Sequence, residues 1–293
     1  MGESGRAASR TAVLVCQGRA AADGRIAADR FTDPVALLLL TDAERVPVTE
    51  VRAGTVPQGW QARVAFEGVR ACAEVVVPRT SAIDDALRAR PSGQLVILGA
   101  GLDTRAWRLA ELAGTDVWEV DHPASQQDKR ARLAAVPELP DTARSVRFTP
   151  VDFAVDALGA ALDAAGHDAS QPTTWLWEGV VPYLTRDEVR STVAALAARS
   201  APGSTLVLNY QAPSARASVG RLLARVLGSS VTSGEPWRSL WPPERMAGLL
   251  AEHGLRVVSD DDLHTLAQRL GSPSGRRSSL RSGRVAVAEY QRD

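Results

Sequence analysis

The 293-residue sequence contains only two cysteines and four histidines, and it has no excess of either charge. Cys16 and Cys72 do not have the spacing of a metal-binding pair, so we interpret them as buried thiols in a reducing compartment. The 34 basic residues balance the 34 acidic ones, which argues against a field that recruits nucleic acid or acidic lipid. No histidine forms a recognisable nucleophile motif with a serine or cysteine, so hydrolase chemistry has no support.

Long apolar segments are also missing. The longest apolar run, residues 35–40, is far too short to span a bilayer, and residues 1–10 lack the apolar core of a signal peptide. We therefore expect a cytoplasmic protein that binds a small molecule, binds neither membrane nor nucleic acid, and holds no metal. At this length the chain can bury a substantial core in one large domain or two small ones.

What the sequence does contain is a strand–turn–helix pattern at residues 94–108, QLVILGAGLDTRAWR. An apolar run stops at Gly99 and Gly101, and a helix-compatible segment follows. A buried parallel strand ends in this way where a ligand approaches the backbone. A second apolar run ends at Asp121, 22 residues after Gly99, where an acid in such folds accepts hydrogen bonds from ribose hydroxyls.

Thr104 occupies the position at which a dinucleotide-binding motif has its third glycine. That glycine allows close helix–strand packing beside a pyrophosphate, so its absence argues against NAD. A nucleoside without a pyrophosphate fits better, and S-adenosylmethionine is the candidate. Glycine turns after strands are also common for purely structural reasons. The helix that follows, and the acid at the end of the next strand, favour the binding interpretation.

Beyond this motif, strand-like and helical patterns alternate. They predict a doubly wound, Rossmann-like α/β fold with a seven-stranded parallel sheet covered on both faces. The predicted strands are residues 95–98, 116–120, 146–151, 174–177, 205–209, 255–259 and 285–290. Residues 1–90 are mostly helical in pattern and are interpreted as an N-terminal cap, with residues 91–293 as the cofactor-binding domain. Pro78 is expected to end a helix and to place Arg79 at the start of the next one.

An insertion at about residues 211–245 follows the fifth predicted strand. It is well placed to be an active-site lid, because ligands lie at the carboxyl ends of such strands. An ordinary surface subdomain is the alternative. Trp237 and Trp241 lie in this insertion and could cover an apolar acceptor. Four other tryptophans lie in or beside predicted core strands and are interpreted as packing residues: Trp107, Trp118, Trp175 and Trp177.

Acidic residues stand at the ends of three predicted strands: Asp121, Asp152 and Glu178. In a doubly wound sheet these ends converge on one crevice. Carboxylates there can accept hydrogen bonds from ribose hydroxyls, an adenine amino group or an ammonium, and S-adenosylmethionine offers all three. Arg79 could bind the carboxylate of the cofactor. Each acid by itself could merely cap a helix, but their convergence favours binding. Other strand-end residues expected at this crevice are Phe153, Gly179, Asn209 and Tyr210.

Several stretches of the chain resemble the leucine carboxyl methyltransferase family of class I S-adenosylmethionine-dependent methyltransferases, especially its bacterial branch. They are LGAGLDTRAWRL (98–109), WEVDHPASQQDKRARL (118–133), FTPVDF (148–153) and LWEGVVPYL (176–184), with an N-terminal echo in RFTDPVALLL (30–39). Together the resemblance spans about residues 9–291. The resemblance implies an O-methyltransferase that leaves S-adenosylhomocysteine and acts on a carboxylate or hydroxyl of a small molecule in secondary metabolism. A protein C-terminal carboxylate, the substrate of eukaryotic members, is the alternative.

The resemblance also implies roles for individual residues. Arg79 would bind the methionine carboxylate, Glu178 would lie by the methionine amino group, and Tyr183 would reach toward the acceptor. The remaining residues implied in cofactor binding are Gly99 and Gly101 along the cofactor, Asp121 at the ribose hydroxyls, and Asp152 and Phe153 at the adenine. The family places a basic residue in its first helix, and either Arg19 or Arg30 fits that position.

Two other classes of function stay open, an NAD(P)-dependent oxidoreductase and a non-catalytic cofactor-binding protein. Among methyl acceptors, a carboxylate is already ionised at pH 7, so the scarcity of well-placed bases favours it over a hydroxyl. His122 follows Asp121 and could face the crevice, but the start of a helix is the preferred interpretation. His167 is expected to be exposed to solvent in a polar loop.

Overall fold

The computed structural model describes residues 9–153, 156–213, 237–271 and 278–291. The strands are β1 (Gln94–Leu98), β2 (Asp116–Asp121), β3 (Ser145–Pro150), β4 (Thr173–Trp177), β5 (Thr205–Gln211), β6 (Leu255–Asp262) and β7 (Gly283–Tyr290). The helices are α1 (Arg10–Ala22), α2 (Pro34–Leu38), α3 (Asp42–Ala53), α4 (Trp60–Ala89), α5 (Arg105–Arg108), α6 (Pro123–Ala134), α7 (Leu158–Ala164), α8 (Arg186–Ala198), α10 (Pro243–Ala251), α11 (Leu263–Arg269) and α12 (Ser278–Ser282). Two short 3₁₀ helices, η1 (Ala110–Leu112) and η2 (Val181–Tyr183), complete the described elements.

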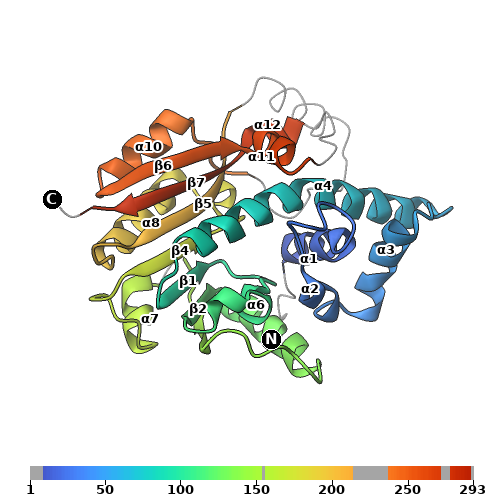
Figure 1. The fold of residues 1–293 in the computed structure, drawn as a ribbon, viewed down its shortest axis with the longest axis horizontal. Coiled ribbons are helices and arrows are strands. Elements are labelled where there is room, and N and C mark those ends of the chain that lie inside the picture. Colours follow the sequence, from blue (N-terminus) through green and yellow to red (C-terminus); the bar gives the residue numbers. More distant parts are fainter. Residues whose placement is uncertain (1–8, 154–155, 214–236, 272–277, 292–293) are drawn as a thin grey trace, which may run out of the picture.

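The strands form one sheet in the order β3-β2-β1-β4-β5-β7-β6, which confirms the predicted doubly wound, seven-stranded architecture (Figure 1). The pairs from β3 to β5 are parallel, as expected. The last strand differs from the prediction, because β7 inserts between β5 and β6 and is antiparallel to both. Apolar periodicity reports which residues are buried but not the direction of a strand, so the sequence pattern could not show this.

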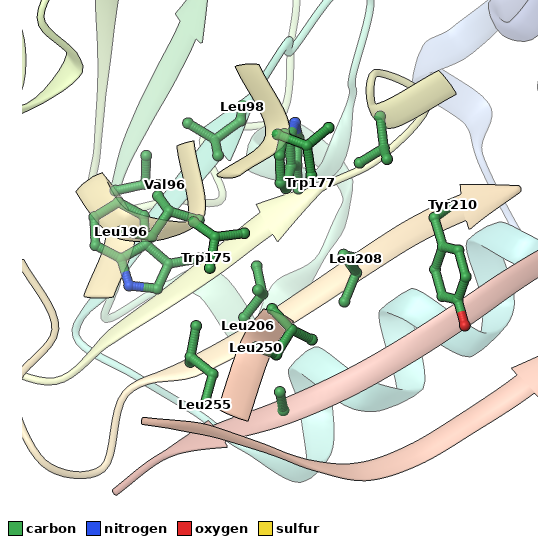
Figure 2. Packing of buried hydrophobic residues seen from close by; sticks show 14 of the residues in the cluster. Val96, Leu98, Trp175, Trp177, Leu196, Leu206, Leu208, Tyr210, Leu250 and Leu255 are labelled. Atoms are coloured by element: carbon green, nitrogen blue, oxygen red, sulfur yellow. The ribbon is translucent and has the colours of Figure 1, made fainter. Parts of the chain in front are cut away.

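Helices cover both faces of the sheet. On one face, residues of α7, α8 and α10 pack against β1, β2, β4 and β5 in a single apolar cluster. Figure 2 shows Trp175 and Trp177 of β4 in this cluster, beside Leu206 and Leu208 of β5. On the other face, α4, α5 and α11 pack against the alternate residues of the same strands. Trp118, Trp175 and Trp177 are fully buried, which confirms their interpretation as packing residues.

Helix α4 runs without a break through Pro78, so the prediction that Pro78 ends a helix is wrong. A proline inside a helix removes one hydrogen bond and its ring clashes with the preceding turn, at a cost of about 3 kcal/mol or more. Burial on both sides offsets that cost: Val77 packs among the N-terminal helices, and Ile83 packs on the sheet. Arg79 therefore lies inside one long helix that crosses the sheet (Figure 1).

Helices α1–α3 lie beyond the carboxyl ends of the parallel strands and enclose an apolar cluster with the first half of α4 (Figure 1). Asp33 caps α2 by accepting the Ala36 N–H at 3.0 Å, with Pro34 at the first helical position, as the sequence predicts. Leu102, from the turn after β1, belongs to the same cluster. The N-terminal helices are thus packed directly on the glycine turn. The division into a cap at 1–90 and a domain at 91–293 stays a prediction.

The predicted lid is described only at its two ends, because residues 214–236 lie outside the described residues. Trp241 does not cover an open site. It is 3% exposed and belongs to the apolar cluster beside α8 and α10, and its backbone N–H donates to the Gln211 carbonyl at 2.9 Å. Trp237 is 40% exposed. Among the helices of the described ranges, none has the length and apolar character needed to cross a membrane.

Candidate functional site

The turn after β1 brings the two predicted glycines next to Asp121. Gly99 has a φ of +64°, and a Cβ there would lie 2.2 Å from Val180 Cγ2, so only glycine fits against the segment that follows β4. Gly101 also has a positive φ, of +48°, and its N–H donates to Asp121 Oδ2 at 2.5 Å. The other oxygen, Asp121 Oδ1, accepts the His122 N–H at 2.7 Å. The predicted pairing of this turn with the end of β2 is present.

Charged side chains hold the rest of this turn from three directions. Arg19 of α1 donates to the Leu102 carbonyl at 2.5 Å, and Lys129 of α6 donates to the Asp103 carbonyl at 2.7 Å. Thr104 Oγ1 donates to Asp33 Oδ2 at 2.7 Å. Thr104, which stands where a dinucleotide motif would have glycine, therefore ties the turn to the N-terminal helices.

Glu178, directly after β4, lies between two arginines. Arg105 Nη1 donates to Glu178 Oε2 at 2.7 Å, and Arg79 Nε lies 2.6 Å from Glu178 Oε1. The Arg79 contact is a close ion pair, and both of its atoms are buried. The Glu178 side chain is 11% exposed. The structure thus brings together two predicted residues from distant elements, Arg79 in the middle of α4 and Glu178 at a strand end.

The two arginines decide the charge of Glu178. Burial by itself raises the pKa of a carboxyl group, because the charged form loses its hydration. The guanidinium groups of Arg105 and Arg79 outweigh this effect and hold the pKa of Glu178 well below its usual range. Glu178 is therefore an anion at neutral pH. Asp121 forms no ion pair within the described ranges. Burial raises its pKa, although the N–H groups of Gly101 and His122 and the charge of Lys129 oppose the shift.

The predicted adenine residues lie at the neighbouring strand end. The Val151 N–H donates to the Asp121 carbonyl at 2.9 Å, which places Asp152 beside Asp121. The Asp152 side chain is 40% exposed, and its Oδ2 lies 3.9 Å from His122 Nε2. Phe153 packs at the margin of the apolar cluster on the sheet. His122 caps α6 by accepting the Ala124 N–H at 3.2 Å, which confirms its interpretation as a helix start.

Tyr183 ends the 3₁₀ helix η2, five residues after Glu178. The carboxyl-terminal part of the predicted lid returns to this turn. The Arg238 N–H donates to the Pro182 carbonyl at 2.7 Å, and Ser239 Oγ donates to the Val181 carbonyl at 3.1 Å. The returning end of the insertion is therefore anchored on the Tyr183 turn.

Two strand-end residues do not face the crevice, contrary to expectation. Asn209 Nδ2 donates to the Arg284 carbonyl at 2.9 Å, so its side chain supports β7. Tyr210 is fully buried, and its hydroxyl donates to Asp260 Oδ2 of β6 at 2.5 Å. Figure 2 shows the Tyr210 ring beside the apolar cluster. Strand β5 runs on to Gln211, so these two residues lie within the sheet and not after it.

His167 is also not where it was expected. It is 5% exposed and packs between the rings of Trp118 and Trp175, with its Nε2 2.9 Å from Thr173 Oγ1. This position is at the amino end of β4, away from the glycine turn. His167 does lie in a loop, between α7 and β4, but the expected exposure is wrong, because the indole rings of Trp118 and Trp175 bury it.

The sequence reasoning missed two buried charged residues of the site, Arg105 and Lys129. Arg105 is 2% exposed and Lys129 is 1% exposed. Lys129 lies 2.6 Å from Glu119 Oε2, and Glu119 points away from the apolar cluster that holds its strand neighbours. The signal in the sequence was a charged residue at an apolar position of a strand, Glu119 within DVWEVD. Such a residue requires a partner, but the pattern does not say which residue supplies it.

Between the two N-terminal candidates, the structure places Arg19 beside the site. Arg19 is 7% exposed, and besides its bond to the Leu102 carbonyl it forms an ion pair with Asp33 at 2.8 Å. Arg30 forms a half-exposed pair with Asp85 at 3.0 Å. Arg19 thus supports the glycine turn, and a direct contact of Arg19 with a cofactor stays a prediction.

The residues of this edge fit the polar groups of S-adenosylmethionine. Each Asp121 oxygen accepts one backbone N–H, and a carboxylate has further lone pairs for hydroxyl groups. The Arg79–Glu178 pair offers one cation and one anion. Arg105 Nη2 is also buried without a partner among the described residues. Within those same ranges, no group of three or more possible metal ligands occurs, and the absence of a metal stays a prediction.

Comparison with known families and proteins gives a consistent result. A profile of the leucine carboxyl methyltransferase family matches residues 12–197. A relative from Mycolicibacterium paratuberculosis, provisionally named an S-adenosyl-L-methionine-dependent methyltransferase, is 40% identical over 197 residues, which cover 65% of this chain and 60% of the relative. A protein of the same provisional name from Mycobacteroides abscessus is 33% identical over 262 residues, which cover 86% of this chain and 84% of that protein. The chain thus spans less than two thirds of the first relative's length.

Solved structures share the fold at low sequence identity. A protein from Thermobifida fusca, provisionally named a methyltransferase, superimposes with a TM-score of 0.58 at 17% identity, over 99% of this chain and 97% of that one. A DUF574 family protein from Streptomyces avermitilis superimposes with a TM-score of 0.59 at 16% identity, over 97% and 98%. At these identities the similarity concerns the fold alone.

Proposed function

The chain belongs to the leucine carboxyl methyltransferase family, and from this premise we propose that it is an S-adenosylmethionine-dependent methyltransferase. The observation that carries the proposal is the Arg79–Glu178 pair, one cation and one anion 2.6 Å apart beside the glycine turn, with each side chain 11% exposed. An amino-acid zwitterion presents the complementary groups, a carboxylate for Arg79 and an ammonium for Glu178. S-adenosylmethionine carries such a zwitterion, whereas NAD does not.

The neighbouring strand end supports the nucleoside half of the same ligand. Asp121 ends β2 and Glu178 follows β4, so β1 lies between them, and the Gly101 N–H already donates to one oxygen of Asp121. A carboxylate in this position accepts the two ribose hydroxyls, and Asp152 and Phe153 on the next strand are then the residues for the adenine. One extended ligand can therefore span the edge from β3 to β4.

When bound, S-adenosylmethionine supplies a methyl group on a sulfonium, whose transfer leaves a neutral thioether. The work of the protein is then to hold the methyl group and the acceptor in line and to keep water out. Such positioning lowers a barrier by roughly several kcal/mol. Arg79 and Glu178 hold one end of the cofactor and Asp121 holds the other, so the sulfur between them is fixed. Tyr183, on the turn that follows Glu178, is the residue for positioning the acceptor.

The proposed acceptor is a carboxylate or hydroxyl of a small molecule of secondary metabolism, and the proposed compartment is the cytoplasm. A carboxylate needs no general base at pH 7, whereas a hydroxyl does. His122 follows β2, and β1 lies between β2 and β4, so this histidine stands on the nucleoside side and not beside Tyr183. This placement favours the carboxylate. A protein C-terminal carboxylate is the alternative.

Calorimetric titration of the purified protein with S-adenosylmethionine and, separately, with NADH tests the cofactor. We expect micromolar binding of S-adenosylmethionine and none of NADH. Binding of NADH alone would overturn the proposal and support an oxidoreductase. Because a cofactor retained from expression would hide binding, the protein should first be unfolded, freed of small molecules and refolded, and the released fraction should be identified by mass spectrometry.

The acceptor class is tested with cofactor that carries an isotopically labelled methyl group. Incubation with a panel of carboxylic acids, phenols and peptides that end in a free carboxylate shows which class takes up the label. Mild base then separates the products, because methyl esters release methanol and methyl ethers do not. We expect base-labile label on small acids. Base-stable label would assign a hydroxyl acceptor, and labelled peptide would assign the protein substrate.

A further inference from the structure

Arg105 binds three carboxylates at the carboxyl edge of the sheet, and it has no role in the proposed function. It begins α5, inside the motif GLDTRAWR, and is 2% exposed. Its Nε donates to Asp84 Oδ1 of α4 at 2.7 Å, and its Nη1 donates to Glu178 Oε2 at 2.7 Å and to Asp103 Oδ2. Its third nitrogen, Nη2, is buried without a partner among the described residues.

We propose that Arg105 is a positioning residue, whose guanidinium holds the Glu178 carboxylate in place to receive the ammonium of the cofactor's amino-acid moiety. The inference rests on the proposed function, because it concerns the same ligand. It adds a residue that does not itself need to touch the ligand. Arg79 lies on one oxygen of Glu178 and Arg105 binds the other, so Arg105 determines how the carboxylate is oriented relative to Arg79.

The geometry requires an arginine at this position. The side chain reaches three carboxylates on three segments of the chain: Asp84 on α4, Asp103 on the glycine turn and Glu178 after β4. A guanidinium has five N–H donors in a planar fork and can bind all three at once. A lysine ammonium is a single point charge and cannot keep the same directions. Arg105 thereby joins the glycine turn, which faces the nucleoside half, to Glu178, which faces the amino-acid half.

The charges around Glu178 also depend on Arg105. Glu178 is buried, and burial of a carboxylate is costly unless cations compensate for it. Arg105 donates a hydrogen bond to Glu178, and its charge contributes more than that of Arg79 to the low pKa of Glu178. Without Arg105, the pKa of Glu178 rises, because one of the cations that favour its charged form is lost.

The test compares two ligands that differ only at the amino-acid end. S-adenosylhomocysteine carries the zwitterion, whereas 5′-methylthioadenosine lacks it but retains the nucleoside. For Arg105→Lys we expect S-adenosylhomocysteine to bind about ten- to a hundredfold more weakly, as for loss of one charge-assisted hydrogen bond. Binding of 5′-methylthioadenosine should change by less than about threefold, because the nucleoside contacts do not involve Glu178.

Arg108→Lys is the matched control. Arg108 lies on the same helix, its side chain is 4% exposed, and it pairs with Asp84 at 2.8 Å, but it has no ion pair with Glu178. Its replacement should destabilise the fold to a similar degree without changing the ratio of the two affinities. A folded Arg105→Lys variant that loses both ligands equally would show that Arg105 only supports the fold, and the proposal would be overturned.

A double-mutant cycle tests whether Arg105 acts through Glu178. In a Glu178→Gln background, Arg105→Lys should cause no further loss of S-adenosylhomocysteine affinity, because the group that it positions is already changed. Additive losses would contradict the proposal. If the wild type binds neither ligand, the proposed function itself fails, which is a different result from equal loss in the variant.

A second variant covers the case in which Arg105→Lys does not fold. Asp84→Asn keeps Arg105 and Glu178 but weakens the contact that orients the guanidinium. We expect a loss of about threefold for S-adenosylhomocysteine alone. Unchanged affinity for S-adenosylhomocysteine in this folded variant would overturn the proposal.

Discussion

The two ends of strand β4 bury polar groups in different ways. At the amino end, Thr173 Oγ1 meets His167 Nε2 at 2.9 Å and accepts a hydrogen bond from Gln94 Nε2 at 3.2 Å, and its backbone N–H donates to Ser204 Oγ at 3.0 Å. At the carboxyl end, Glu178 is surrounded by arginines. The amino end is held mainly by hydrogen bonds of uncharged groups, with one charged residue, Arg199, whose Nη2 lies 3.2 Å from His167 Nδ1. The other is held together by ions.

We interpret the amino end of β4 as structural support and the carboxyl end as the proposed ligand-binding end. Neutral hydrogen bonds each contribute about 1 kcal/mol and carry little desolvation cost. Buried ions cost several kcal/mol each to desolvate and often stabilise a fold no better than apolar residues would. Within the described residues, buried arginine nitrogens without a hydrogen bond occur at both ends, Arg105 Nη2 at the carboxyl end and Arg199 Nε near His167. What distinguishes the carboxyl end is the gathering of several charges around Glu178, which is what a charged ligand needs.

The largest effect on stability should come from breaking the buried pair at the carboxyl end. Lys129→Met leaves Glu119 buried without its cation, and we expect a loss of about 3–5 kcal/mol in the free energy of unfolding, measured with urea. The double variant Lys129→Met with Glu119→Leu removes both charges and should recover most of that loss. A double variant as unstable as the single one would contradict this account of the pair.

The next largest effect should be on ligand affinity. Asp121→Ala removes the carboxylate that meets the Gly101 N–H, and we expect S-adenosylhomocysteine to bind about a hundredfold more weakly, as measured by calorimetry. Asp116→Ala is the control at the opposite end of the same strand, where Asp116 pairs with Arg144 on the surface. That variant should bind with unchanged affinity. Normal affinity in a folded Asp121→Ala variant would refute the ribose assignment.

At the amino end, the expected effect depends on pH. Burial, together with Arg199, lowers the pKa of His167 from 6.5 to about 4. The unfolded chain therefore binds more protons than the folded protein between these values, so stability falls as the pH drops from 6.5 to 4. The loss should reach about 3 kcal/mol.

The measurement is the difference in unfolding free energy between the wild type and His167→Phe at each pH. Other titrating groups, including Glu119, cancel in this difference. The advantage of the wild type should shrink as the pH falls through this window. A difference that is independent of pH would mean that His167 titrates normally in the folded state.

The smallest effect should come from one neutral hydrogen bond at the amino end. Trp175 Nε1 donates to Ser200 Oγ at 2.9 Å. Ser200→Ala should lower the free energy of unfolding by about 1 kcal/mol and leave ligand affinity unchanged. A change in affinity would show that the two ends of the sheet are coupled, and the comparison between them would have to be abandoned.

Much of the fold was predictable because it depends on local patterns. The apolar runs that end at Gly99 and Asp121 mark strand ends, and both residues lie where the strand–turn–helix pattern predicts. Asp33 followed by Pro34 predicts a helix start, because an aspartate side chain can accept a free N–H of the first turn and proline suits the first helical position. Asp33 forms the predicted cap. The family motifs identified the family for the same reason, since they are short and continuous.

Where the predictions were wrong, distant residues had overruled a local preference. Pro78 should end a helix, yet burial against α1 and the sheet keeps α4 continuous. His167 stands among polar neighbours in the sequence, yet two tryptophans bury it. Trp241 belongs to a predicted lid, yet it packs in the core beside α8 and α10. In each case the free energy of burial exceeds the local conformational preference. Some of the residues that bury the side chain lie far away in the sequence, so the local pattern does not reveal them.

The sequence by itself determined the order of strands and helices, the glycine turn and the acids at the strand ends, because these depend on periodicity and turn chemistry within a few residues. Only the tertiary structure decided which charges meet. Arg105 binds Glu178 across 73 positions of the chain, and Thr104 binds Asp33 across 71. A buried charge requires a partner, but any of the 34 basic or 34 acidic residues could supply it in the sequence, and the fold alone selects one.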